Sequence, residues 1–374
     1  MRPNPTPRVR LGDEQVTPIV SASIDTAALR HNLQVVRSWA PASRVMAVIK
    51  ANAYGHGLVA VARALESADA FAVARVDEGL TLRSAGIDKP VVLLEGVFDQ
   101  EQLEIATRCA FELVVHTPEQ IDLLKGAPAG SSFKIWLKLD TGMNRLGLKG
   151  SAFDAALTAL RDLRVVRQPV GLFTHLACAD SPESPTTALQ LAAFAAATGL
   201  HPGERSVANS AAMLSFPGLA SDWVRPGLVI YGVSPLAGAV GADYGLKPVM
   251  TLRTRIIAVK DVTPGEHVGY GGTWTATRPT RLAVAAIGYG DGYPRGLGSG
   301  APVLVNGERA PLAGRVSMDM IGIDVTELDK EPKLGDPVIL WGEGLPVEEL
   351  AVWAETIPYE LLCGISQRVA VAIR

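Results

Sequence analysis

The sequence predicts an α/β protein in which an N-terminal (β/α)8 barrel of the TIM type is followed by a mostly β C-terminal domain. After residue 44, eight apolar strand-like runs recur over about 190 residues, most of them followed by an amphipathic helical stretch. Around residues 236–246 this rhythm stops, and short β-type runs continue to the end of the chain. The chain has 374 residues, enough for a barrel of roughly 250 residues and a second domain.

The elements of the barrel can be placed in order. A strand at 21–25 comes first, and Asp25 can cap a helix that runs to about Trp39. This first strand precedes the eight, and its pairing with the second domain stays open. The barrel strands are predicted at 45–50, 70–75, 90–96, 111–116, 133–140, 169–176, 205–209 and 224–232. Helices are predicted at 58–67, 77–84, 100–109, 118–124, 151–163 and 187–198.

An open, doubly wound sheet is the alternative to the barrel. Such a sheet usually carries a Gly-x-Gly-x-x-Gly fingerprint after its first strand, and this chain has none there. The barrel is therefore preferred. We expect a flexible leader at residues 1–19, the barrel at 20–245 and the β domain at 246–374.

The β domain is predicted from short alternating runs. They lie at 249–259, 268–276, 281–287, 302–305, 308–312 and 317–325, with one short helix near 347–355. Asn306-Gly307 separates two of these runs and is the strongest short-range signal for a β-hairpin.

Composition excludes several classes of protein. The net charge of −3 gives no basic surface, which argues against a nucleic-acid partner. The three cysteines are widely spaced and form no Cys-x-x-Cys pair, so we expect reduced thiols and no metal site. The N-terminus has Arg2, Arg8 and Arg10 but no apolar segment behind them. We therefore expect a cytoplasmic protein without a membrane partner.

Lys50 directly follows the apolar run from Val45 to Ile49. A lysine at the C-terminal end of a buried strand lies where barrel enzymes keep their chemistry. Burial can neutralise its amine, which can then form a Schiff base with a carbonyl cofactor. Tyr54, on the glycine-rich turn that follows, is within reach of a phosphate. The alternative is a strand-end lysine that extends into solvent.

Other polar residues end the predicted strands in the same way, and each alone has a structural explanation. His175 can be a core histidine, Lys138 and Asp140 can form an ion pair, and Arg225 can be a salt-bridge partner. Since the C-terminal ends of all barrel strands meet at one face, their joint occurrence favours a shared site. The residues at these ends are Lys50, Lys138, Asp140, His175, Asn209, Ser210 and Arg225, with Arg145 on the loop after the fifth strand.

The chain from about residue 23 to 369 resembles the alanine racemases, which are pyridoxal-phosphate enzymes of fold type III. The motifs that carry the resemblance occur in this order: Val-Ile-Lys-Ala-Asn-Ala-Tyr-Gly-His-Gly (48–57), Lys-Leu-Asp-Thr-Gly-Met-Asn-Arg-Leu-Gly (138–147), Thr-His-Leu-Ala-Cys-Ala-Asp (174–180), Ala-Asn-Ser-Ala-Ala (208–212), Val-Arg-Pro-Gly-Leu (224–228), Val-Gly-Tyr-Gly (268–271), Ile-Gly-Tyr-Gly-Asp-Gly (287–292) and Gly-Arg-Val-Ser-Met-Asp-Met (314–320).

The resemblance implies two catalytic groups, because inversion requires a proton to leave one face of the substrate Cα and another to arrive on the opposite face. Lys50 matches the lysine that binds pyridoxal phosphate as a Schiff base and serves one face. Tyr270 matches the tyrosine of the other face, which in this family comes from the partner subunit. The resemblance thus implies a homodimer with composite active sites.

The resemblance also implies the binding residues. His175 matches a histidine near the cofactor ring, and Arg225 matches the arginine at the pyridine nitrogen, where it should weaken the electron sink. Lys138 matches a lysine that carries a carbamate in many members. The remaining assignments are Tyr54, Asn209, Ser210, Gly227, Leu228 and Tyr359 for the cofactor, Arg145, Met318 and Asp319 for the substrate, and Tyr289 and Arg295 for the access channel. Ser317 departs from the cysteine of some members, which leaves the substrate range open.

The implied activity is the interconversion of L-alanine and D-alanine, supplying D-alanine for the cell wall. Three alternatives are kept. A racemase of broader specificity, acting on serine or basic amino acids, shares the fold. A pyridoxal-phosphate amino-acid decarboxylase would need an acidic partner for the pyridine nitrogen, where this chain has Arg225. A non-catalytic pyridoxal-phosphate-binding protein would lack the β domain and Tyr270.

Overall fold

A computed structural model of the chain describes residues 18–219 and 221–374. The chain divides into two units, a barrel unit (Thr26–Lys247) and a β unit that combines Pro248–Arg374 with residues up to Asp25. Residues 1–17 of the predicted leader lie outside the described residues. Among the helices that the structure describes, none combines the length and the apolar character needed to cross a membrane.

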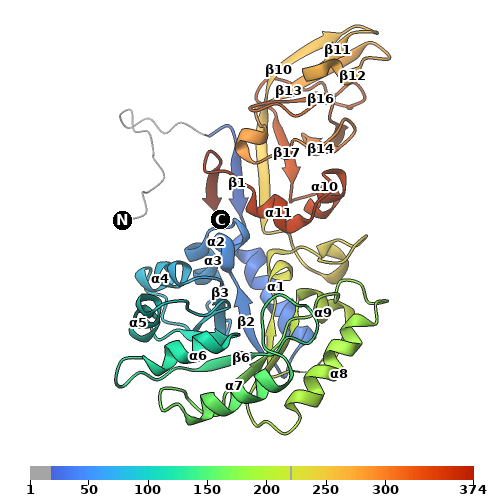
Figure 1. Ribbon diagram of the computed structural model, residues 1–374. Coiled ribbons are helices and arrows are strands. Elements are labelled where there is room, and N and C mark those ends of the chain that lie inside the picture. The colour runs from blue at the N-terminus through green and yellow to red at the C-terminus, as the bar shows by residue number, and fades with distance from the viewer. Residues whose placement is uncertain (1–17, 220) are drawn as a thin grey trace, which may run out of the picture. The chain divides into compact units, whose positions relative to one another are not determined.

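The barrel unit contains the predicted closed barrel of eight parallel strands, which excludes an open sheet (Figure 1). Each strand pairs in parallel with the next, and the last strand pairs with the first. Nearly every residue of these strands is buried, as a sheet covered on both faces requires. The strands are β2 (Arg44–Val48), β3 (Ala70–Val73), β4 (Val91–Leu93), β5 (Glu112–Val115), β6 (Ile135–Lys138), β7 (Gly171–Phe173), β8 (Arg205–Asn209) and β9 (Trp223–Arg225).

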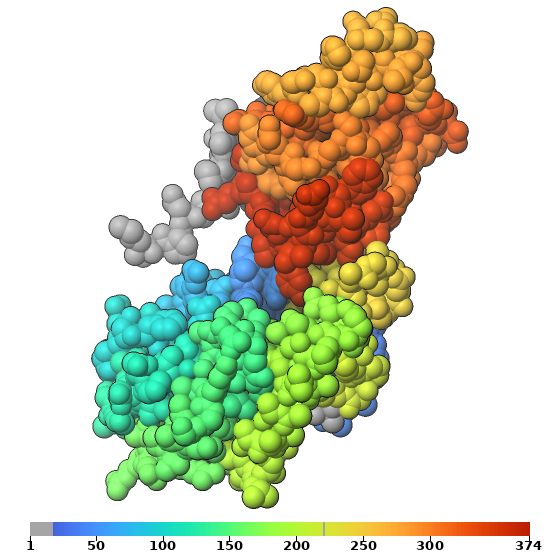
Figure 2. All heavy atoms as spheres, turned by 45° about the vertical axis from the view of Figure 1, so that its right-hand side comes forward, coloured from blue at the N-terminus to red at the C-terminus, as the bar shows by residue number. Residues whose placement is uncertain are grey.

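Helices follow most of the strands and lie on the outside of the barrel (Figure 1), and on the face drawn in Figure 2 the residues coloured cyan to green form the outer surface of this unit. Local signals explain several of their starts. The Asp99 carboxylate caps α5 by accepting the Gln102 N–H at 2.8 Å, and Pro118 occupies the first turn of α6. The helices are α1 (Thr26–Trp39), α3 (Leu58–Ala64), α4 (Val76–Ser84), α5 (Gln100–Arg108), α6 (Pro118–Lys125), α7 (Gly150–Asp162), α8 (Thr186–Thr198) and α9 (Ser210–Ser215).

The N-terminal ends of the strands are packed with aromatic rings and ion pairs. Trp136 and Trp223 meet edge to face at 6.0 Å, and the Arg44 guanidinium lies 4.2 Å from the Trp223 ring centroid. The Lys134 ammonium pairs with Glu204 at 3.0 Å. These residues fill the N-terminal end, so the polar loops that can bind a ligand belong to the opposite end.

The β unit is built on one eight-stranded sheet of order β15-β14-β17-β10-β1-β18, with β13 pairing to β10 and β16 to β13. The sequence did not indicate β17, β18 or the helix α11. The elements are β1 (Ser21–Ile24), β10 (Met250–Val262), β13 (Thr280–Ala285), β14 (Pro302–Val305), β15 (Glu308–Pro311), β16 (Ile321–Asp324), β17 (Pro337–Trp341) and β18 (Ala370–Ile373), with α10 (Val347–Trp353) and α11 (Pro358–Cys363).

Strand β1 belongs to the β unit, although the sequence-based division began the barrel at residue 20. It pairs antiparallel with β10 and parallel with β18. Hydrogen bonds to these two strands, rather than proximity in sequence to the barrel, decide where the strand lies.

Two turns show how glycine shapes the β unit. Asn306 (φ 53°) and Gly307 (φ 88°) join β14 to β15, which confirms the predicted hairpin. The prediction of a continuous strand at 268–276 was wrong. Gly269 and Gly271 both have φ of 74° and break it into β11 (His267–Val268), a 3-10 turn η3 (Tyr270–Gly272) and β12 (Trp274–Thr275). Tyr270 therefore lies on the turn of a hairpin.

Candidate active site

The C-terminal ends of the barrel strands carry the predicted polar residues of the barrel. Lys138 ends β6, Asn209 ends β8 and Arg225 ends β9. Lys50 lies two residues beyond β2, and His175 lies two residues beyond β7. Because neighbouring strands pair in register around the closed barrel, these residues share its C-terminal face.

Lys50 is followed by a left-handed turn, the segment α2 (Lys50–Tyr54) of Figure 1. Ala51, Asn52, Ala53 and Tyr54 all have φ between 52° and 54°. Left-handed backbone costs an L-residue roughly 1–2 kcal/mol, so four in succession persist only because surrounding contacts hold them. This strained turn fixes where Lys50 and Tyr54 lie relative to each other.

Hydrogen bonds between the turn and the segments around it provide those contacts. The Glu78 carboxylate, from α4, accepts the Ala51 N–H at 2.5 Å and the Ala74 N–H at 2.7 Å. The Asn52 side-chain oxygen accepts the Leu58 N–H at 2.9 Å. Sequence reasoning missed Glu78. Its place as the third residue of a helix indicated a capping role, but nothing in the local pattern indicated that it would reach Ala51.

His56 also supports the turn and was not predicted. Its ring is fully buried, and Nδ1 donates to the Tyr54 carbonyl at 2.8 Å. The ring lies 4.5 Å from that of Tyr231, whose hydroxyl donates to the Val48 carbonyl at 3.1 Å. Burial lowers the pKa of His56 from 6.5 to about 4, so the ring is neutral at pH 7.

The depressed pKa of His56 predicts acid sensitivity. Between pH 6.5 and 4 the unfolded chain holds a proton on this ring that the folded chain does not. The contribution of the neutral His56 ring to the free energy of unfolding is therefore fully present above pH 6.5. The free energy of unfolding falls by about 3 kcal/mol as the pH drops to 4. Urea unfolding at several pH values should show a smaller loss for His56→Asn. The matched control His31→Asn, which replaces a partly exposed histidine of the same unit, should keep the wild-type loss. Equal losses of stability in the wild type and both variants would contradict the assignment of the acid sensitivity to His56.

Arg225 is a buried cation. Its guanidinium donates to the Ser206 hydroxyl at 2.7 Å, and to the carbonyls of Thr174 at 2.6 Å and Val207 at 3.2 Å. Its central carbon lies 3.8 Å from the Phe173 ring centroid. Burial lowers its pKa to about 9, which leaves it charged at neutral pH. Among the described residues no carboxylate pairs with it, so the salt-bridge explanation for Arg225 is wrong.

The charge of Arg225 acts on its neighbours. His175 Nδ1 lies 3.4 Å from the guanidinium, and burial, followed by the charges of Arg225 and Lys138, lowers the pKa of His175 well below 6.5. Burial, then Arg225 and Arg145, lowers the pKa of Lys138 to about 8. The site thus combines a neutral histidine with an excess of positive charge, which suits an anionic ligand.

The loop after β6 is folded around Asp140. The Asp140 carboxylate accepts the N–H groups of Gly142 at 3.0 Å and Asn144 at 3.1 Å, and pairs with the Lys149 ammonium at 3.4 Å. Asp140 thus pairs with Lys149 and not with Lys138, so the ion pair considered from the sequence is wrong. The same contacts define the loop that carries Arg145.

A small polar cradle lies beside the Lys50 turn. The Gly227 N–H donates to the Ser210 hydroxyl at 2.8 Å. A Cβ on Gly227 would lie 2.6 Å from the Tyr54 hydroxyl, so only glycine permits this approach. Leu228 follows at the start of a 3-10 turn. Asn209 instead caps α9 by accepting the Ala212 N–H at 2.9 Å.

The other predicted residues lie in the β unit. Tyr270 is 72% exposed, which leaves its ring available to another molecule. Tyr289 lies on the 3-10 turn η4 (Tyr289–Asp291), and its N–H donates to the Ser317 carbonyl at 3.0 Å, so its turn lies against the Met318 loop. Asp319 pairs with Arg368 at 2.7 Å. Arg295 is exposed, and Tyr359 is half-buried on α11.

The fold and the cation-rich C-terminal end of the barrel define a two-domain (β/α)8-barrel enzyme. The family model described as "Alanine racemase, N-terminal domain" matches residues 24–235, and "Alanine racemase, C-terminal domain" matches residues 249–373. The chain therefore belongs to the alanine racemase family, and its enzyme class is that of the isomerases.

Individual relatives agree with the family. The chain is 51% identical over 348 residues to the alanine racemase of Aeromonas hydrophila subsp. hydrophila, covering 93% of this chain and 97% of that one. Identity and coverage are the same for the biosynthetic alanine racemase of Escherichia coli. The crystal structure of the biosynthetic alanine racemase from Pseudomonas aeruginosa has a TM-score of 0.92 and 43% identity, covering 96% of this chain and 100% of that chain.

Proposed function

We propose that the chain is a pyridoxal-phosphate-dependent racemase that interconverts L-alanine and D-alanine. The observation that carries this proposal is the buried Arg225, unpaired by any carboxylate in the described residues, on the same barrel face as Lys50. The relatives named above are alanine racemases, which supports alanine as the substrate. In the cell this activity would supply D-alanine for the wall from a cytoplasmic enzyme.

The residues present fit the cofactor. Tyr54, Ser210, and the N–H groups of Gly227 and Leu228 are neutral donors that suit a phosphate. Because Gly227 has no Cβ, the Tyr54 hydroxyl can approach its backbone, which gathers these donors in one place. Tyr359 is proposed as a further phosphate ligand, and Asn209 positions Ser210 by capping its helix. When bound, pyridoxal phosphate supplies an electron sink that makes the substrate Cα proton removable.

Arg225 distinguishes a racemase from a decarboxylase. Its guanidinium keeps its proton and can only donate a hydrogen bond, so it offers no acid to a ring nitrogen. The decarboxylases of similar architecture use an acidic residue for this partner. His175, half-buried and neutral beside Arg225, adds no second positive charge to the binding region.

The proton transfers are assigned to Lys50 and Tyr270. Lys50 removes or returns the Cα proton on one face, and Tyr270 of the partner subunit acts on the other. The exposed tyrosine on a hairpin turn supports a role completed by a second copy of the chain. A homodimer with composite sites is therefore part of the proposal, which also counts against a non-catalytic binding protein.

The substrate carboxylate is assigned to Arg145 and the backbone of Met318, with Asp319 beside it. Tyr289 and Arg295 border the access channel. Ser317 is small, and a pocket can separate side chains that differ by one methylene by only about 1–3 kcal/mol. Serine, or a basic amino acid if the racemase has broader specificity, is therefore the alternative substrate to compare with alanine in the racemisation assay.

Lys138 is proposed to carry a carbamate. Its lowered pKa of about 8 provides neutral amine at physiological pH, and the surrounding cations favour an anion in its place. The ammonium first loses one proton, and the neutral amine then adds to carbon dioxide and loses a second. The side chain thus changes from cation to anion and can hold Arg145. Protein prepared in carbon-13 bicarbonate should give a carbamate NMR signal that the Lys138→Gln variant lacks. Absence of this signal in the wild type would refute the proposed carbamate on Lys138.

The test of the function combines two measurements. The purified protein with cofactor should show a visible absorbance band that borohydride removes. In deuterium oxide it should exchange the α-proton of both L-alanine and D-alanine and abolish their optical rotation. A band without exchange on alanine, serine or lysine would favour the decarboxylase or the binding protein. No band after addition of the cofactor would refute the proposal.

A further inference from the structure

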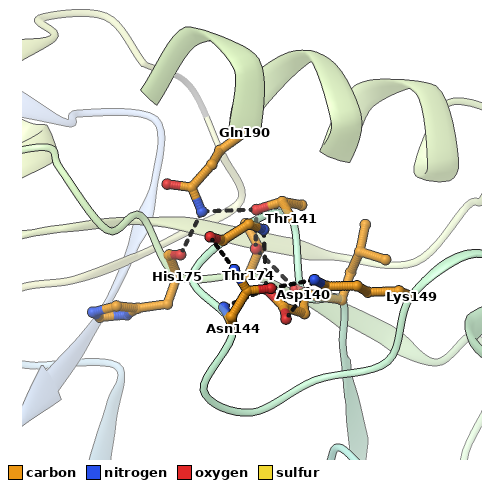
Figure 3. A network of polar contacts seen from close by, with 9 residues as sticks. Asp140, Thr141, Asn144, Lys149, Thr174, His175 and Gln190 are labelled. Atoms are coloured by element: carbon orange, nitrogen blue, oxygen red, sulfur yellow. Dashed lines mark hydrogen bonds and ion pairs between the residues drawn. The ribbon is translucent and has the colours of Figure 1, made fainter. Parts of the chain in front are cut away.

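Gln190 is a buried side chain that links two loops of the barrel face. It extends from α8 toward Thr141 and His175 (Figure 3), and its exposed fraction is 1%. Its amide nitrogen donates to the Thr141 hydroxyl and to the His175 carbonyl, both at 3.1 Å. Its amide oxygen accepts the Ala177 N–H at 2.8 Å. Both amide hydrogens and the oxygen are thus used.

The two linked loops carry proposed site residues. Thr141 begins the loop that contains Arg145, whereas Ala177 follows His175 on the next loop. The Thr141 and Thr174 hydroxyls lie 2.9 Å apart, and the Thr174 carbonyl accepts the Arg225 guanidinium at 2.6 Å. The hydrogen-bonded network therefore runs from Gln190 to the buried cation of the site.

We infer that Gln190 is a positioning residue: it holds the loop of Arg145 in the geometry needed to bind the substrate carboxylate, and it holds the loop of His175 in place beside it. The inference rests on the proposed function for the roles of those two residues. Gln190 needs a carboxamide here, because this group provides two donors and an acceptor. The carboxylate of a glutamate has no donor, and the thioether of a methionine has no donor and is only a weak acceptor. Loss of the link displaces Arg145 and His175 without removing them.

Gln120 provides a matched control. It lies on α6, is 5% exposed, and accepts the His116 N–H at 2.8 Å while donating to the Glu95 carbonyl at 3.0 Å. It therefore makes the same kind of link between the loops after β4 and β5. Those loops carry none of the proposed site residues.

The experiment compares Gln190→Met, Gln190→Glu and Gln120→Met as holoenzymes, measuring KM and kcat for alanine, melting temperature and hydrogen exchange. The two methionine variants should lose similar stability, about 2–4 °C in melting temperature for each buried link. Gln190→Met should lower kcat/KM by about 10–100-fold, mainly through KM, since small displacements of binding groups have effects of this size. Gln120→Met should stay within about twofold of the wild type.

Two further readouts separate positioning from stability. Peptides covering 140–149 and 174–180 should exchange faster in Gln190→Met and at the wild-type rate in Gln120→Met. Gln190→Glu keeps the acceptor for Ala177 but lacks both donors, so it should not restore KM. If Gln190→Met does not fold, Thr141→Val removes one partner of the link and should raise KM in the same direction.

Equal kinetics in Gln190→Met and Gln120→Met, with an active wild type, would overturn the inference and leave the proposed function intact. An inactive wild type would overturn both the proposed function and the role of Gln190 in it. Unchanged exchange of the two peptides in Gln190→Met would overturn the structural link itself, whatever the activity.

Discussion

Lys50→Ala is expected to lose the visible absorbance of bound cofactor and to reduce racemisation by about a thousandfold or more. The amine is the only group assigned both to bond the cofactor and to transfer the proton on its face. The strained turn that begins at Ala51 places this amine and no other at the end of β2. Absorbance spectra and racemisation rates at saturating alanine measure the two losses separately.

The control for Lys50 is Lys125→Ala, which removes an exposed lysine of the same unit that pairs with Asp122. This variant should retain both the absorbance and the rate. A Lys50→Ala protein that keeps the borohydride-sensitive band would show that another amine binds the cofactor, and the assignment of Lys50 would fail.

Tyr270→Phe is expected to slow racemisation by about 10²–10⁴-fold, the usual contribution of one general acid or base. The two enantiomers have equal free energies, so kcat/KM must fall equally in both directions. The substitution should instead affect the two enantiomers unequally in the exchange of their α-protons with solvent deuterium. Lys50 still removes a proton from its own face, so one enantiomer should exchange its α-proton with retained configuration while the other does not.

Tyr293→Phe is the matched control for Tyr270. Tyr293 is fully buried in the same unit, and among the described residues its hydroxyl has no hydrogen-bond partner, so its removal should leave activity unchanged. Exchange of both enantiomers at wild-type rates in Tyr270→Phe would exclude Tyr270 as the second base.

Mixing the two inactive variants tests the composite site. A dimer of one Lys50→Ala chain and one Tyr270→Phe chain contains one site with both defects and one intact site if the tyrosine comes from the partner. Activity should therefore return after the subunits are exchanged. If lysine and tyrosine came from the same chain, every site would keep one defect, and no activity would return.

The sequence predicted the fold because its signals were local. Strand and helix periods repeat within each βα unit, and the buried parallel strands appear as short apolar runs. The Asn306-Gly307 turn required nothing beyond two residues that adopt positive φ. The prediction of a continuous strand at 268–276 was wrong for a reason that is also local. Glycines at 269 and 271 allowed a turn that the alternating pattern concealed.

The site was only partly accessible from the sequence. Lys138, Asn209 and Arg225 were visible because each ends an apolar run, and strand ends gather at one face of a barrel. The supporting residues were not visible. Glu78 binds the N–H of Ala51 from 27 positions away, and Gln190 reaches Thr141 from 49 positions away.

By itself, the sequence determined the barrel, the β domain and the face on which the polar residues meet, because periodicity and turn chemistry act between neighbouring residues. Only the tertiary structure decided that the backbone after Lys50 is left-handed, that β1 pairs with β10 and β18, and that Arg225 is buried without a carboxylate partner in the described residues. These features depend on contacts between distant segments, whose energies are absent from any local pattern.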